Sequence, residues 1–260
     1  MKGSKPMKKK ILAIVLCVAM LAIAIVGGTM AYFTDTHAQT NTFVAGNVGI
    51  SLDEAKIKPD NDPESNTFGD LIADGTTRTT ATQEYHLFPG MTVTKDPTIT
   101  VDDGSEDAYV AAIITVTFAD GTDMAVLRKN GICMEHWKDM LNAEAILEGD
   151  YIGTVPEKEH PLNGVNGMKV YGDDRYSVYQ IADAANLTYT IYMFFEGAQA
   201  EGTTITPFNK MVIPETWDNA DMAAVNGMEI NVVAYATQTN GFKDCYTAMT
   251  TAFPEAFDFT

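Results

Sequence analysis

The stretch that decides the fold is Ala108–Phe118, Ala-Tyr-Val-Ala-Ala-Ile-Ile-Thr-Val-Thr-Phe, the most apolar segment outside the N-terminus. Its β-branched and aromatic residues suit a pleated strand, and its nearly unbroken apolarity predicts a central position in a sheet. Two further segments with β character follow at 186–195 and 227–237. The chain is therefore predicted to be mainly β.

Weaker strand patterns surround these three. Strands are expected at 41–52, where Gly46 would shift the inward face by a bulge, at 78–87, and at 92–101, interrupted by Asp96-Pro97. Four shorter candidates are 149–154, 168–171, 176–181 and 204–208. Long connections between strands favour Greek-key crossings, so the predicted fold is an antiparallel two-sheet sandwich, jelly-roll-like, with short helical insertions.

The helical insertions are expected near 123–147, 218–225 and 243–253, where apolar residues recur at helical spacing. The segment 55–77 is rich in Asp, Asn, Pro and Gly, and is interpreted as a long irregular connection, either mobile or hiding a short element. We expect residues 32–260 to form a single β-sandwich domain carrying these helical decorations.

The N-terminus has the pattern of a secretory signal peptide. Lysines cluster in residues 1–10, an uncharged apolar run occupies 11–26, and Thr29 and Ala31 place small side chains before a predicted cut between Ala31 and Tyr32. The run is short for a permanent membrane span, although an uncleaved signal anchor is the alternative. Either reading places residues 32–260 outside the cytoplasm.

The formal charge of the chain is −18, and because residues 1–31 hold five lysines and no acid, the remainder carries −23. Such a charge repels phosphate backbones, which excludes a general nucleic-acid binder. Only Cys133 and Cys245 remain beyond the leader. Export permits one disulfide between them, but two buried thiols are equally compatible with the sequence.

No catalytic motif is apparent. None of the four histidines, His37, His86, His136 and His160, pairs with another at metal-ligand spacing, and the five serines lack a nucleophile context. No cofactor is therefore expected. The acidic loops at 60–62 and 102–107 offer oxygen ligands that Ca²⁺ could use, but neither follows the EF-hand order, and solvated acidic loops are the alternative reading.

Residues 27–35, Gly-Gly-Thr-Met-Ala-Tyr-Phe-Thr-Asp, followed by 41–52, Asn-Thr-Phe-Val-Ala-Gly-Asn-Val-Gly-Ile-Ser-Leu, resemble the start of proteins of the TasA/camelysin family. A fainter similarity continues through residues 88–101. The resemblance implies export by a dedicated signal peptidase, a jelly-roll-like fold, and a role in extracellular fibres and biofilm matrix at the surface of a Gram-positive bacterium. Some relatives are described as metalloproteases, but this sequence lacks a matching zinc motif.

These observations lead to a specific expectation. Once the leader is removed, the segment 32–52 would be a free β-compatible ribbon that could add as a strand to a neighbouring copy, with Phe33, Phe43, Val48 and Ile50 as its inward side chains. Head-to-tail repetition would give a homopolymer, to which other matrix proteins could bind. In an unassembled subunit we expect at least 43–52 to fold back as the first strand of its own sandwich.

Two other functions remain open at this point: a monomeric surface adhesion or binding module, and a cell-surface metallopeptidase.

Overall fold

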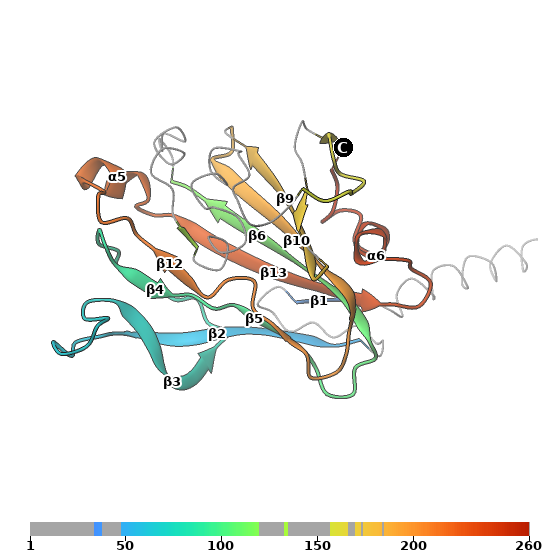
Figure 1. The fold of residues 1–260 in the computed structure, drawn as a ribbon, viewed down its shortest axis with the longest axis horizontal. Coiled ribbons are helices and arrows are strands. Elements are labelled where there is room, and N and C mark those ends of the chain that lie inside the picture. Colours follow the sequence, from blue (N-terminus) through green and yellow to red (C-terminus); the bar gives the residue numbers. More distant parts are fainter. Residues whose placement is uncertain are drawn as a thin grey trace, which may run out of the picture.

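The structure is a computed structural model, and it describes residues 34–37, 48–119, 133–134, 157–165, 170–172, 174–183 and 185–259. These residues form two sheets, shown in Figure 1, and nearly all of their strand pairs are antiparallel. The mainly β, two-sheet arrangement predicted from the sequence is confirmed.

The first sheet has six strands with β6 at its centre, between β13 and β10. In sheet order these are β1 (Thr34–His37), β13 (Glu229–Gln238), β6 (Ala108–Thr117), β10 (Thr188–Gln199), β9 (Tyr176–Asp183) and β8 (Tyr171–Gly172). Strand β6 is the segment that the sequence predicts to be central. It is buried on both faces over most of its length, which explains why it lacks a polar-apolar alternation.

The second sheet has seven strands. In sheet order these are β11 (Thr204–Ile205), β5 (Thr98–Val101), β2 (Ile50–Pro59), β3 (Leu71–Thr79), β4 (Thr92–Thr94), β12 (Lys210–Val212) and β7 (Cys133–Met134). Asp96-Pro97 separates β4 from β5, as the sequence predicts, because proline cannot donate to the ladder.

The main core lies between the sheets, where Ile50, Val93 and Ile99 from the second sheet share one apolar cluster with Ile114 and Ile191 from the first. A second, smaller core covers the opposite face of the first sheet. There, helix α6 (Cys245–Ala252) and the C-terminal residues pack on Phe194, Tyr179 and Tyr235. The first sheet is therefore enclosed on both sides.

The two helices of the described chain, α5 (Asn219–Ala224) and α6, lie inside the ranges 218–225 and 243–253 predicted to be helical. Asp218 and Asp244 cap their N-termini by accepting backbone N–H bonds. The predicted helical region 123–147 and the weak strand candidate at 149–154 lie outside the described residues, apart from Cys133–Met134. That pair forms strand β7 against β12 and not the start of a helix.

Two sequence interpretations are wrong. Residues 55–77 are not an irregular connection, since most of them belong to the β2–β3 hairpin, whose turn spans residues 60–70. Conversely, residues 80–87 do not continue the predicted strand that begins at Arg78, but run as irregular chain beside β2. A polar, Thr-rich sequence can form either a strand or irregular chain. Here, residues that pair with a neighbouring strand form a strand, and residues without such a pairing do not.

Candidate assembly edge

One edge of the first sheet is formed by β1, the first strand of the described chain. Strand β1 pairs antiparallel with the C-terminal half of β13, with Thr34 opposite Thr237 and His37 opposite Ala234. Figure 1 shows β1 between β13 and β2, and it contacts both strands, so it lies where the two sheets meet. Backbone pairing to a single neighbour holds this strand in place.

Strand β1 covers only part of the edge available to it. Residues 234–237 of β13 are paired with β1, whereas residues 229–233 have no strand partner on that side within the described chain. The side chains of the covered half alternate between the two cores: Ala234 and Ala236 face the main core, and Tyr235 packs in the second. A strand that pairs with this half of β13 therefore lies at the border of both cores and helps to shield them from solvent.

The structure brings two of the four predicted assembly residues into the body of their own subunit. Val48 and Ile50 are 4% and 0% exposed and belong to the main core, and Ile50 lies opposite Val101 at the start of β2. The N–H of Gly49 donates to Ser105 Oγ at 3.2 Å, which ties this point to the β5–β6 loop. Phe33, Phe43 and the predicted cleavage residues Thr29, Ala31 and Tyr32 lie outside the described residues.

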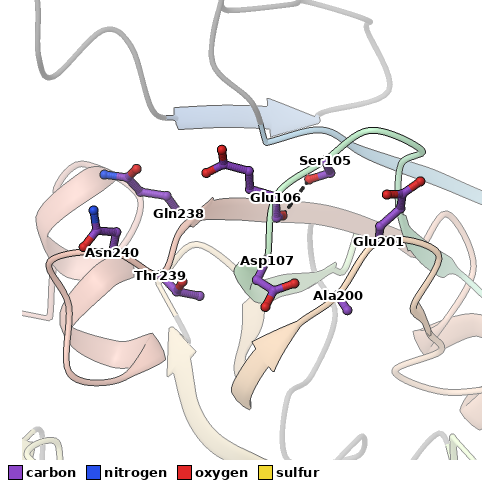
Figure 2. Close-up of a pocket in the computed structure, with 8 residues that line it drawn as sticks. All are labelled: Ser105, Glu106, Asp107, Ala200, Glu201, Gln238, Thr239 and Asn240. Carbon is purple, nitrogen blue, oxygen red and sulfur yellow. Dashed lines mark hydrogen bonds between the residues drawn. The ribbon is translucent and has the colours of Figure 1, made fainter.

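A hollow of about 390 Å³ opens at the end of the first sheet where β13 stops and β1 starts. Figure 2 shows its lining, which comes from three chain turns: Ser105, Glu106, Asp107, Ala200, Glu201, Gln238, Thr239 and Asn240. It includes part of the acidic loop that the sequence marked for Ca²⁺. No three His, Cys, Asp or Glu side chains are placed to share a metal ion anywhere in the described chain.

The second predicted calcium loop is satisfied by its own hydrogen bonds. Asp60 is 7% exposed; its Oδ1 accepts from the N–H of Asp62 at 3.1 Å and its Oδ2 from the hydroxyl of Thr67 at 2.7 Å. Hydrogen bonds from Ser65 and Thr67, together with the Asp62 N–H, lower the pKa of Asp60. This carboxylate closes the turn of the β2–β3 hairpin.

The described histidines are separate from one another. His86 is exposed, and His160 is half-buried, where its ring packs edge-on against Tyr246 with centroids 4.7 Å apart. Burial lowers the pKa of His160, and its Nδ1 accepts from the N–H of Leu162, so it serves the second core. His136 and the side chain of His37 lie outside the described residues. The described residues thus form no zinc site of the kind a metalloprotease requires.

Cys245 is a free, buried thiol that donates to the carbonyl of Val110 at 3.2 Å, so it does not form the bridge to Cys133 that the sequence left open. Burial raises the pKa of this thiol well above its usual value, which makes it unreactive.

One polar cluster escapes sequence analysis altogether. Lys95 pairs with Glu54, and the side chain of each is 9% exposed. Gln83 donates to Glu54 Oε1 at 3.1 Å, and the Lys95 ammonium lies 5.5 Å from the ring centre of Tyr85. These four residues come from separated positions with no recognisable spacing, so only the fold, which places residues 80–87 beside β2, brings them together. We call them the Glu54 cluster.

No helix in the described parts of the chain has the length and apolarity needed to cross a membrane. One of the comparisons with known proteins, that with protein families, agrees with the N-terminal resemblance. The profile of the camelysin metallo-endopeptidase family matches residues 6–64, a range that contains most of the predicted leader, β1, all of β2 and the first part of the hairpin turn. No curated protein and no solved structure matches the chain. The profile match over residues 6–64 supports the resemblance of the N-terminal part of this chain to the TasA/camelysin family.

Proposed function

We propose that this protein is a secreted structural subunit of extracellular fibres or biofilm matrix, and that it assembles by adding its N-terminal segment as a strand to a neighbouring subunit. The observation that carries the proposal is the place of β1. It is an edge strand of four residues, bonded to β13 through its backbone and followed by a connection to β2 on the other sheet.

An edge strand of this kind can be exchanged at little cost. The same backbone hydrogen bonds form whether the strand comes from the same chain or from another copy, so exchange conserves the bonds while joining two molecules. The half of β13 that β1 leaves uncovered gives a longer incoming strand additional backbone groups to pair with. Because Val48 and Ile50 are anchored in their own core, the exchanged segment would end before Val48.

Deletion of residues 32–45 tests the proposal. Protein lacking the leader should form filaments visible by electron microscopy, whereas the deletion variant should remain unassembled. As a matched control, alanine substitution of Phe68, an exposed residue on the hairpin turn, should leave the filaments intact. Filaments that persist unchanged after the deletion would show that the N-terminal segment does not join the subunits.

The description of the matched family favours a second candidate, a metal-dependent endopeptidase. The described residues do not assemble its ligands, so we propose a non-catalytic role. Elemental analysis of the purified protein and a casein-digestion assay with and without a chelator separate the two. Bound zinc together with chelator-sensitive proteolysis would identify a peptidase. A protein that never assembles yet retains a cation or glycan would instead be an adhesion module.

A further inference from the structure

We propose that Lys95 and Gln83 become joined by an amide bond that forms within the folded chain, with Glu54 carrying the proton. The proposal rests on the arrangement of the Glu54 cluster, where a primary amine, a carboxylate and a carboxamide meet in a site largely shielded from water.

The carboxylate of Glu54 contacts both nitrogens that the reaction would exchange. Its Oε2 pairs with Lys95 Nζ, and its Oε1 accepts from Gln83 Nε2 at 3.1 Å. One carboxylate can therefore serve both nitrogens. Oε2 acts as the base for the incoming Lys95 nitrogen, and Oε1 delivers the proton to the departing Gln83 nitrogen.

The carboxamide is held in a single orientation and polarised. The N–H of Ile57 donates to Gln83 Oε1 at 3.0 Å, and Gln83 Nε2 donates to the carbonyl of Ala55 at 2.9 Å. A backbone N–H can only donate and a carbonyl can only accept, so these two bonds fix which atom is oxygen and which is nitrogen. The Ile57 N–H is also placed to stabilise negative charge that develops on Oε1.

The reaction balances without an oxidant or a co-reactant. Lys95 Nζ transfers a proton to Glu54 and attacks Cδ of Gln83, forming the C–Nζ bond and a tetrahedral centre whose oxyanion faces the Ile57 N–H. Glu54 returns the proton to Nε2, and the C–Nε2 bond breaks. Glu54 carries the second proton that Nζ loses in the same way, so the leaving nitrogen departs as ammonium with both protons, the new amide keeps one N–H, and Glu54 is again a carboxylate.

The site lies where such a bond would matter mechanically. Strand β2 changes partner from β5 to β3 next to Glu54, and its pairing register shifts between Ala55 and Ile57. An amide from Lys95 to Gln83 would fasten residues 80–87 across this irregular point. If the N-terminal segment bears load in a fibre, as the proposed function has it, β2 is the next strand along the chain to receive that load, and Glu54 and Ala55 are buried at this point of it.

Mass spectrometry of a tryptic digest of the purified full chain tests the bond. The relevant trypsin sites are Arg78, Lys95 and Arg128, with none between them. An amide on Lys95 blocks cleavage there, so we expect the peptide 79–128, lighter than its sequence mass by about 17 Da, the mass of ammonia. Fragmentation should fail to separate residues 83–95. The Glu54→Gln variant should yield the ordinary peptide 79–95 at full mass.

Two results would overturn the proposal. Release of peptide 79–95 at full mass from the wild-type chain would show that the cluster is an ion pair only. A peptide carrying Glu54 linked to Lys95 with loss of about 18 Da, the mass of water, would place the bond on the carboxylate instead. Both readings come from the wild-type protein, so they do not depend on whether the variant folds. Neither result bears on whether fibres form, which separates this test from that of the proposed function.

Discussion

At the scale of single residues, Arg78 connects three parts of the second sheet. Its Nε donates to Asp53 Oδ1 at 2.6 Å and its Nη1 to Asp96 Oδ2 at 2.9 Å, while Nη2 reaches the carbonyls of both residues. Asp96 in turn accepts from the N–H of Ala55 at 2.7 Å. One guanidinium thus holds β3, β2 and the break between β4 and β5 together.

Replacing Arg78 with lysine should destabilise the fold, because an ammonium cannot donate to both carboxylates in this fork. The group is about one-third exposed, with 34% of its side chain accessible, so solvent screening limits the loss to about 1 kcal/mol. Urea unfolding followed by circular dichroism measures it. The control is Lys58→Ala, which removes the more exposed pair with Asp74 and should change stability by less than about 0.5 kcal/mol. An equal effect of both variants would contradict the account.

The cap of helix α6 makes a prediction about pH. Asp244 Oδ1 accepts from the N–H of Thr247 at 2.7 Å. Partial burial raises the pKa of Asp244, but the hydrogen bonds from Thr247 and the nearby Lys243 outweigh it, so the pKa lies below its ordinary value of 3.8. A lowered pKa means that the carboxylate stabilises the folded state above that value, and that this contribution is lost as pH falls through the folded-state pKa.

Asp244→Ala should therefore cost about 1 kcal/mol at pH 7 and progressively less below about pH 4. Asp244→Asn keeps an acceptor at the cap without a titrating charge, so its stability relative to wild type should improve as the pH falls. Thermal unfolding at several pH values between neutrality and pH 3 distinguishes the three proteins. An Asp244→Ala penalty that grows on acidification would contradict the assignment of this cap.

At the scale of elements, the C-terminal segment is an integral layer of the fold. Phe257 is 3% exposed and its ring contacts Tyr192, Phe194 and Tyr235 on the outer face of the first sheet. Phe257→Ala should destabilise the protein by about 3–5 kcal/mol, since it removes a buried aromatic ring and leaves a cavity. Phe68→Ala, at a residue 60% exposed, should stay within about 0.5 kcal/mol in the same denaturation assay. A Phe257 variant as stable as wild type would show that the segment merely rests on the sheet.

How far sequence predicts these elements depends on burial. Strand β6 and its neighbours β10 and β13 can be recognised in the sequence because they are rich in apolar residues. Burial of these side chains in the two cores is what stabilises the three strands. The β2–β3 hairpin is mostly exposed, and polar contacts of Asp60 and Arg78 stabilise it. The side-chain amide of Gln83 also contributes, because it bonds to the backbone of β2 where the bulge interrupts the ladder. Pairwise polar contacts between distant residues leave no periodic pattern, so neither the hairpin nor the Glu54 cluster could be predicted.

At the scale of the whole molecule, the net charge opposes the strand exchange that we propose. Residues 32–260 carry −23, so identical copies repel at long range. Raising the ionic strength from about 0.01 to 0.15 M shortens the screening length from about 30 to about 8 Å. Filament growth followed by light scattering should therefore be faster at the higher salt. Growth that is independent of salt, or slower in it, would contradict an assembly limited by this repulsion.

The central claim, that the N-terminal strand passes from one subunit to the next, is tested most directly by a cysteine pair across β1 and β13. Asp35 lies opposite Ala236, and opposed residues of antiparallel strands are close enough for a disulfide. The double variant Asp35→Cys/Ala236→Cys, without the leader, is assembled under reducing conditions, oxidised and run on a non-reducing gel, with Asp35→Cys alone as the control.

Strand donation predicts that oxidised filaments of the double variant run as covalent multimers, while the unassembled protein runs as an internally bridged monomer and the single variant forms no such ladder. Filaments whose subunits all run as internally bridged monomers would show that each β1 stays in its own sheet, and would contradict the claim.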